Sequence, residues 1–147
     1  MLDNYISISK EYKYLGVYVT ESGNFNIDHL LNKARKAMFA LRKRTNDIQL
    51  LPKVHLDLFN CLILPILTYV LEVWGCETIL KNRCKSFSSF LGRLEKHKIE
   101  KLYMNFIRCV LGVNKRSSHC AMRGEVGAFP VGINILKNVL KYFIYLK

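Results

Sequence analysis

The sequence predicts a mainly α-helical chain with a short β hairpin at its N-terminal end, and three observations support this fold class. Tyr, Val and Thr residues gather in one early segment, which turn-forming residues follow. Further along, apolar residues recur at the helical spacing of about 3.6 residues. Half of the 147 residues are apolar, too large a share for a disordered chain of this charge. We therefore expect a folded body of about one domain.

The hairpin is predicted within residues 1–25. Residues 12–20 have the composition of a strand and end at the turn-forming run 21–24. Ile6 and Ile8 alternate with serines, so this short segment is a candidate partner strand.

A first amphipathic helix is predicted from Asn26, which is a candidate N-cap. Asp28 lies in its first turn and basic residues lie in its last, the arrangement that the helix dipole favours. One face collects the apolar residues Leu30, Leu31, Ala34, Ala37, Met38 and Leu41.

A second helix is predicted from Pro52 toward Gly75, since proline is favoured in a first helical turn. Pro65 removes a backbone hydrogen bond from its middle and should kink or split it. The uncharged run between Asp57 and Glu72 is shorter than the roughly 20 apolar residues of a bilayer span. We therefore expect a buried core helix and no integral membrane span.

The second half of the chain predicts a helical continuation over residues 93–147. Residues 76–92 lack a regular apolar period and are interpreted as a loop or insertion. The helical pattern returns at Leu94, and Gly112 suits a left-handed C-cap.

Two shorter patterns follow within this continuation. Ser117 or Ser118 can open a short helix that ends near Gly124 or Gly127. Pro130 begins a final helical pattern that still runs at the last residue, which we interpret as truncation from a longer chain.

The charge predicts a polyanionic partner. Lys and Arg number 23 against 11 Asp and Glu, a formal net charge of +12, so nucleic acid ranks first and an anionic membrane surface second. The five cysteines form an odd set without paired spacing, and no secretory leader follows Met1. These features favour free thiols in a reducing, intracellular compartment.

The first helix carries the candidate nucleic-acid-binding residues, and it has no acidic residue after Asp28. A solvated surface explains any single one of them equally well, but the unbalanced run favours phosphate contact for the helix as a whole. The candidates are Lys33, Arg35, Lys36, Arg42, Lys43 and Arg44. A second basic set is interpreted as solvated surface and comprises Lys81, Arg83, Lys85, Arg93, Lys96, Lys98 and Lys101. Tyr14, Tyr18 and Trp74 could stack on bases, although aromatic residues at such spacings are more often core.

No catalytic residue and no metal ligand is predicted. Two-metal chemistry needs clustered carboxylates, yet the acidic residues are never closer than five positions, as in Glu95 and Glu100. His119 and Cys120 lack the paired spacing of a zinc site, so we expect a buried thiol beside a surface or capping imidazole. We therefore expect this chain alone to be inactive as a polymerase.

Several short motifs occur in the order found in one enzyme family. Lys13-Tyr14-Leu15-Gly16-Val17 resembles the strand that closes the palm of reverse transcriptases from LINE-type (non-LTR) retrotransposons, at the position of a primer-gripping hairpin. The helix with Ala34, Ala37, Ala40 and Leu41 is similar to the one that opens the thumb of these enzymes. A Pro-x-x-x-Tyr-x-x-Glu-x-Trp helix of the family is matched by Pro65, Tyr69, Glu72 and Trp74. Motifs of the downstream helical region are matched by Ile99-Glu100-Lys101, Leu111-Gly112-Val113 and Gly124-Glu125-x-Gly127 with Pro130.

The resemblance covers nearly the whole chain, and it implies a role without catalysis. The sequence lacks the family's catalytic aspartates, its endonuclease domain and its Cys-His knuckle, and residues 76–92 match no part of it. The implied protein is a fragment of an RNA-directed DNA polymerase that holds an RNA or RNA–DNA template-primer duplex through its phosphate backbone. A separate palm would be the partner that binds Mg²⁺, and the location would be the nucleus or the cytoplasm. The implied parts are a palm-closing hairpin (1–25) with Tyr14, Leu15 and Gly16 as primer-grip-like residues, basic thumb-like helices (26–75), the insertion (76–92) and the helical continuation (93–147).

Three other interpretations stay open on the sequence. The chain could be a stand-alone basic module that binds nucleic acid or protein, or a peripheral membrane protein that uses the apolar run. It could also be a translated remnant without a selected function. Affinity for a duplex, compared with affinity for anionic vesicles, separates the first two.

Overall fold

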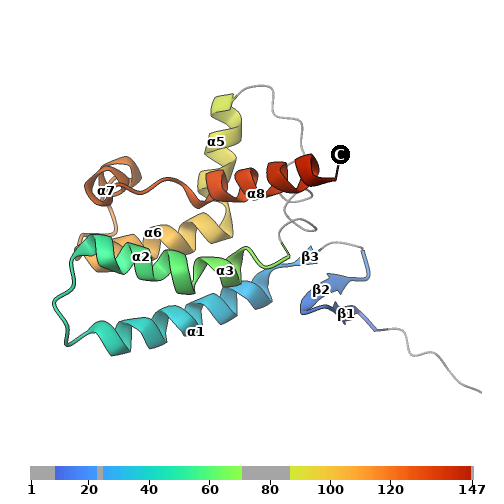
Figure 1. The fold of residues 1–147 in the computed structure, drawn as a ribbon, viewed down its shortest axis with the longest axis horizontal. Coiled ribbons are helices and arrows are strands. Elements are labelled where there is room, and N and C mark those ends of the chain that lie inside the picture. Colours follow the sequence, from blue (N-terminus) through green and yellow to red (C-terminus); the bar gives the residue numbers. More distant parts are fainter. Residues whose placement is uncertain (1–8, 23–24, 71–86, 147) are drawn as a thin grey trace, which may run out of the picture.

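The computed structural model describes residues 9–22, 25–70 and 87–146 (Figure 1). Most of the described chain is helical, and a small three-stranded antiparallel sheet lies at its N-terminal end. This confirms the predicted fold class, mainly α with a short N-terminal hairpin.

The hairpin pairs β1 (Glu11–Tyr14) with β2 (Val17–Thr20), and β3 (Phe25–Asn26) pairs with the other edge of β2. The prediction of a single strand over residues 12–20 is therefore wrong. Leu15 and Gly16 have φ values of +46° and +84° and make a tight turn, because positive φ at both positions matches the twist of paired strands. The partner strand expected at Ile6 and Ile8 lies outside the described residues.

Helix α1 (Asp28–Thr45) confirms the first predicted helix. Its N-cap position is Ile27 rather than Asn26. The Asn26 side chain still serves the helix start, since its Oδ1 accepts a hydrogen bond of 3.0 Å from the Asp28 amide. Leu30, Leu31 and Ala34 are buried on the predicted apolar face.

Pro65 splits the second predicted helix as expected. Helix α2 (Pro52–Leu62) ends one residue before the single turn α3 (Leu64–Leu67), because Pro65 has no N–H to donate to the carbonyl four residues earlier. Helix α3 ends at Leu67 and residues 68–70 form a turn, while residues 71–75 of the predicted helix lie outside the described residues.

Helices α5 (Phe87–Lys96) and α6 (Lys98–Leu111) follow. The interpretation of residues 76–92 as a loop is wrong for 87–92, which are helical, while 76–86 lie outside the described residues. His97 separates the two helices: its Nδ1 accepts a hydrogen bond of 3.4 Å from the Ile99 amide and caps α6. Gly112 closes α6 with a φ of +63°, as predicted.

Helices α7 (His119–Val126) and α8 (Val131–Tyr145) complete the described chain. Ser118 and Gly127 occupy the ends of α7, and Pro130 precedes α8, which confirms these predicted boundaries.

Helix α6 is the centre of the fold. It contacts α1, α2, α5, α7 and α8, and in Figure 1 α1 and α2 lie on one side of it and α8 on the other. The Phe59 ring packs on Phe106 and Tyr103, with centroids 4.7 and 5.0 Å away. Phe59, Ile63 and Leu67 are fully buried, so the described part of the uncharged run is core. No helix in the described ranges is long and apolar enough to cross a bilayer.

Candidate nucleic-acid interface

Helix α1 buries one face and presents its cations on the rest of its surface. Ala34 is fully buried, whereas all six candidate residues predicted from the sequence are exposed. At 100° per residue they form three rows along the helix. The rows are Lys36 with Lys43 opposite Ala34, Arg35 with Arg42 on one flank, and Lys33 with Arg44 on the other.

These cations are not neutralised by carboxylates within the described part of the chain. The ion pairs in that part join Lys98 to Asp28 at 2.7 Å and Arg123 to two glutamates. Arg35 donates to Asn32 Oδ1 at 2.9 Å, and Arg42 donates to Cys109 Sγ at 3.6 Å. Neither contact cancels the positive charge, so the surface is suited to a polyanion.

The hairpin adds to this positive surface. The pKa of His29 in the first turn of α1 is lowered by burial and by three nearby lysines, Lys33, Lys13 and Lys36. Lys13 belongs to β1, and its Nζ lies 6.0 Å from the centroid of the Tyr18 ring. That ring packs on His29, with centroids 4.8 Å apart. One end of α1 and the hairpin therefore share a single positive potential.

The primer-grip-like residues lie at the turn of the hairpin. Tyr14 and Leu15 are 61% and 69% exposed, so the expectation that Tyr14 belongs to the core is wrong. It sits on β1, an edge strand whose residues are all exposed. Tyr18 is half-buried, and Trp74 lies outside the described residues. Tyr69 fixes the turn by donating a hydrogen bond of 3.0 Å from its hydroxyl to the Leu15 carbonyl.

A shallow, mostly apolar pocket of about 330 Å³ lies between α1 and the segment of α3 and Tyr69. Leu30 and Lys33 of α1 line it, together with Pro65, Ile66 and Tyr69. Tyr69 therefore connects Leu15 of the primer-grip-like set with Lys33 of the nucleic-acid-binding set, which the sequence placed in separate candidate sites.

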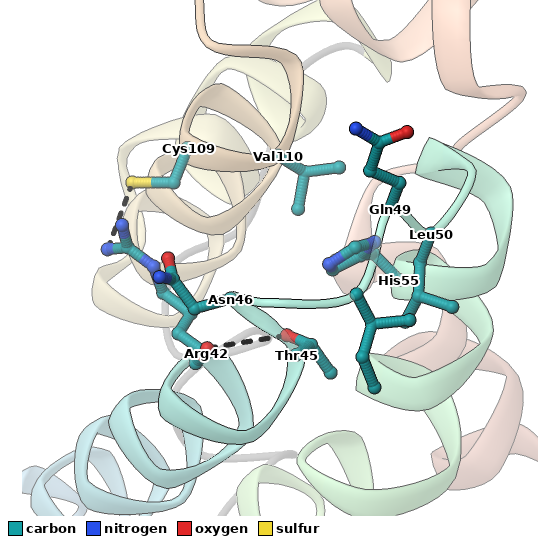
Figure 2. Close-up of a pocket in the computed structure, with 9 residues that line it drawn as sticks. Arg42, Thr45, Asn46, Gln49, Leu50, His55, Cys109 and Val110 are labelled. Carbon is teal, nitrogen blue, oxygen red and sulfur yellow. Dashed lines mark hydrogen bonds between the residues drawn. The ribbon is translucent and has the colours of Figure 1, made fainter.

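A second pocket, of about 230 Å³, lies beyond the other end of α1 (Figure 2). Figure 2 shows the Arg42 guanidinium reaching toward Cys109 of α6, while His55 of α2 points into the space between the helices. Asn46 and Gln49 of the connecting loop also line it, and no carboxylate does so among the described residues. This pocket was not predictable from the sequence, because neutral polar residues in a loop carry no periodic signal.

Three of the described members of the second basic set fit a solvated surface. Lys96, Lys98 and Lys101 are exposed, and Lys98 pairs with Asp28. Arg93 is half-buried, and Lys81, Arg83 and Lys85 lie outside the described residues.

Glu95 and Glu100, two carboxylates that the fold brings together in the described part of the chain, are already paired with a cation. Arg123 of α7 donates to Glu95 and Glu100, each at 2.9 Å, and Glu100 also accepts from the Gly132 amide at 3.4 Å. Burial raises the pKa of Glu100, an effect that Arg123 opposes. This network ties together α5, α6, α7 and α8.

The histidine and cysteine residues do not converge on a metal site in the described part of the chain. No group of three His, Cys, Asp or Glu residues that could hold an ion occurs there. Cys120 is exposed, so the expectation of a buried thiol is wrong, and His119 is half-buried.

No protein-family model, no curated protein and no solved structure matches this chain.

Proposed function

We propose that this chain holds an RNA or RNA–DNA duplex through its phosphate backbone, as the thumb-like part of a LINE-type reverse transcriptase. The observation that supports this most strongly is the surface of α1. Six exposed cations surround its buried face, and none forms an ion pair with a described carboxylate.

The spacing of these cations suits a phosphate backbone. Residues seven apart, such as Lys36 and Lys43, are about 10 Å apart along the helix axis. Double-stranded DNA presents one negative charge per roughly 1.7 Å of its axis, so several phosphates lie within reach of such a row. Each neutralised phosphate releases bound counterions, which provides affinity that does not depend on sequence.

The hairpin turn would guide one strand of the duplex along α1. Tyr69 contacts both Leu15 and Gly16 of the turn, and Lys13 of the hairpin and Lys33 of α1 both lie close enough to His29 to lower its pKa. An exposed turn next to a positive surface can contact the sugar-phosphate backbone of one nucleic-acid strand. This contact is the primer-grip-like role that we propose for Tyr14, Leu15 and Gly16.

The reaction itself would belong to a separate palm. Mg²⁺ in such polymerases needs free carboxylates, but Glu95 and Glu100 are committed to Arg123. These two carboxylates are therefore not available to hold the ion in the proposed arrangement. A nuclear or cytoplasmic location would follow from the polymerase role.

A peripheral membrane protein is the second candidate, because α8 exposes large apolar residues at its end. Ile144 and Tyr145 are 74% and 88% exposed, and Lys141 lies beside them.

Binding to an RNA–DNA duplex, compared with binding to anionic vesicles, separates these two candidates. The affinity of the chain for an RNA–DNA duplex is measured over a series of salt concentrations, and its affinity for anionic vesicles is measured in the same buffers. The proposal expects duplex binding that weakens steeply with salt. Tight vesicle binding with negligible duplex binding would contradict it and support the second candidate.

A further inference from the structure

Phe39 is the exception among the large apolar residues of α1, because it alone of them is exposed. It lies about 140° around the helix from the buried Ala34, in the arc between the rows of Arg42 and Lys43. Its side chain is 73% exposed, so packing within the described chain does not account for it. A phenylalanine placed among cations offers a flat apolar face next to charges that attract phosphate.

The surface around Phe39 is hollowed. A depression of about 490 Å³ is lined by Phe39, Arg42, Lys43, Asn46 and Asp47. Arg42 and Asn46 also line the pocket of Figure 2, so the two depressions adjoin at these side chains. An aromatic face, two cations and an amide therefore meet in one concave surface.

We propose that this surface binds an unpaired nucleotide at the end of the bound duplex, with its base stacked on Phe39. Arg42 and Lys43 bind the phosphate of that nucleotide, and the Asn46 amide is placed to bond the edge of the base. This inference rests on the proposed duplex-holding function and adds a preference for the form of the nucleic acid.

The chemistry of the depression favours a nucleotide over an acidic peptide. A peptide carboxylate would use the cations and leave the phenylalanine exposed, whereas a nucleotide supplies a phosphate and a π-face together. Asp47 repels a second phosphate but can accept a hydrogen bond from the amino group of a base. Bases within a duplex are already stacked on each other, so an unpaired base is the form that can use Phe39.

The test compares short RNA–DNA duplexes that differ only at one end. One duplex is blunt, and the others carry a single unpaired nucleotide on one strand or the other. In a parallel set, a fluorescent adenine analogue takes the place of that unpaired nucleotide. The variants are Phe39→Ala, Phe39→Trp and Phe129→Ala. Phe129 is the matched control because it is 74% exposed and lies between α7 and α8. Circular dichroism verifies that each variant keeps its helicity.

We expect an overhang to tighten binding of the parent chain by about 5-fold or more, as base stacking on an aromatic residue does. Phe39→Ala should abolish this gain, whereas Phe39→Trp and Phe129→Ala should keep it. Equal affinity for blunt and overhanging duplexes would overturn the inference and leave the duplex-holding function standing. A gain that persists in Phe39→Ala would overturn it as well.

A measurement on a single-stranded oligonucleotide tests the stacking site if the chain binds no duplex. If no duplex binds, the proposed function fails, and the fluorescent base in a single-stranded oligonucleotide decides the stacking site. Quenching by the parent chain but not by Phe39→Ala would support that site, and equal signals from both would overturn it.

Discussion

The Tyr69 hydroxyl lies 3.0 Å from the carbonyl oxygen of Leu15 and ties the hairpin turn to the segment that follows α3. The Tyr69 ring also covers Gly16, where an added Cβ would lie 3.3 Å from the ring carbon Cε1. Gly16 has a φ of +84°, which glycine adopts without steric cost. The position of the hairpin beside α1 therefore depends on a tyrosine and a glycine that are distant in sequence.

We expect Gly16→Ala to loosen the hairpin more than Tyr69→Phe does. Alanine at this φ costs about 1–2 kcal/mol and also crowds the ring. Loss of the partly exposed hydrogen bond costs at most about 1 kcal/mol. Amide hydrogen exchange should quicken in β1 and β2 in both variants and stay unchanged in α6. Unaltered exchange in the hairpin of Gly16→Ala would show that the turn does not need its glycine.

The network around Arg123 predicts that loss of the arginine destabilises the fold, and that this destabilisation becomes smaller as the pH falls. Arg123→Met leaves the buried Glu100 carboxylate without its cation, which should lower the free energy of unfolding by about 3–5 kcal/mol at pH 7. Burial then raises the pKa of Glu100 further, so the folded state binds more protons than the unfolded state. The stability of the variant should therefore rise as the pH falls toward the unfolded value of 4.5.

Urea denaturation at pH 7 and pH 5 measures this effect. Adding Glu100→Gln to Arg123→Met removes the buried charge and should recover part of the stability at pH 7, with a smaller pH dependence. A single Arg123→Met variant that loses less than about 1 kcal/mol would contradict the account.

His97 predicts a second pH dependence, of opposite sign. Burial and the neighbouring Lys98 lower its folded pKa below 6.5, so the unfolded state binds more protons in the window beneath that value. The contribution of neutral His97 to the free energy of unfolding is therefore fully present above pH 6.5 and is lost as the pH falls through the folded pKa. His97→Asn keeps a capping acceptor for α6 without a titrating proton. The thermal midpoint of this variant should fall less steeply below pH 6.5 than that of the parent, and identical profiles would exclude His97 as the source.

Most of the helices were predictable from local chemistry, whereas a loop was predicted for residues 87–92 of α5 because they lack a clear apolar period. Gly112 and Gly127 close helices as predicted, because a left-handed cap is a property of a few neighbouring residues. Pro65 breaks its helix for an equally local reason. The hairpin was harder, since Leu15 in the turn has a φ of +46° that its residue type disfavours. A strand-like composition over residues 12–20 therefore concealed two strands.

The candidate interface was predictable only in part. The exposed cations of α1 follow from the period of its buried face, so their positions on the helix were readable from the sequence. The link between Leu15 and Tyr69 depends on tertiary packing and leaves no local pattern. The same is true of Arg123, which joins Glu95 and Glu100 from another helix. Phe39 did leave a signal, because an apolar residue outside the stripe of its own helix is unexplained by the core.

The most direct test of the account is the salt dependence of duplex binding when the cations of α1 are removed. The test variant replaces Lys36, Arg42, Lys43 and Arg44 with Gln, a comparable helix former. The control variant replaces Lys96, Lys101, Lys137 and Lys141 with Gln in the same way. These lysines are exposed on other helices, so the control lowers the net charge by the same amount as the test variant.

The slope of log affinity against log salt for an RNA–DNA duplex should flatten in the α1 variant by about 0.9 for each lost phosphate contact. Duplexes of different sequence should weaken alike, because backbone contacts carry no base information. The control should keep a slope near that of the parent. If the α1 variant binds the duplex as tightly as the parent and with the same slope, its cations are only a solvated surface and the duplex-holding function is contradicted.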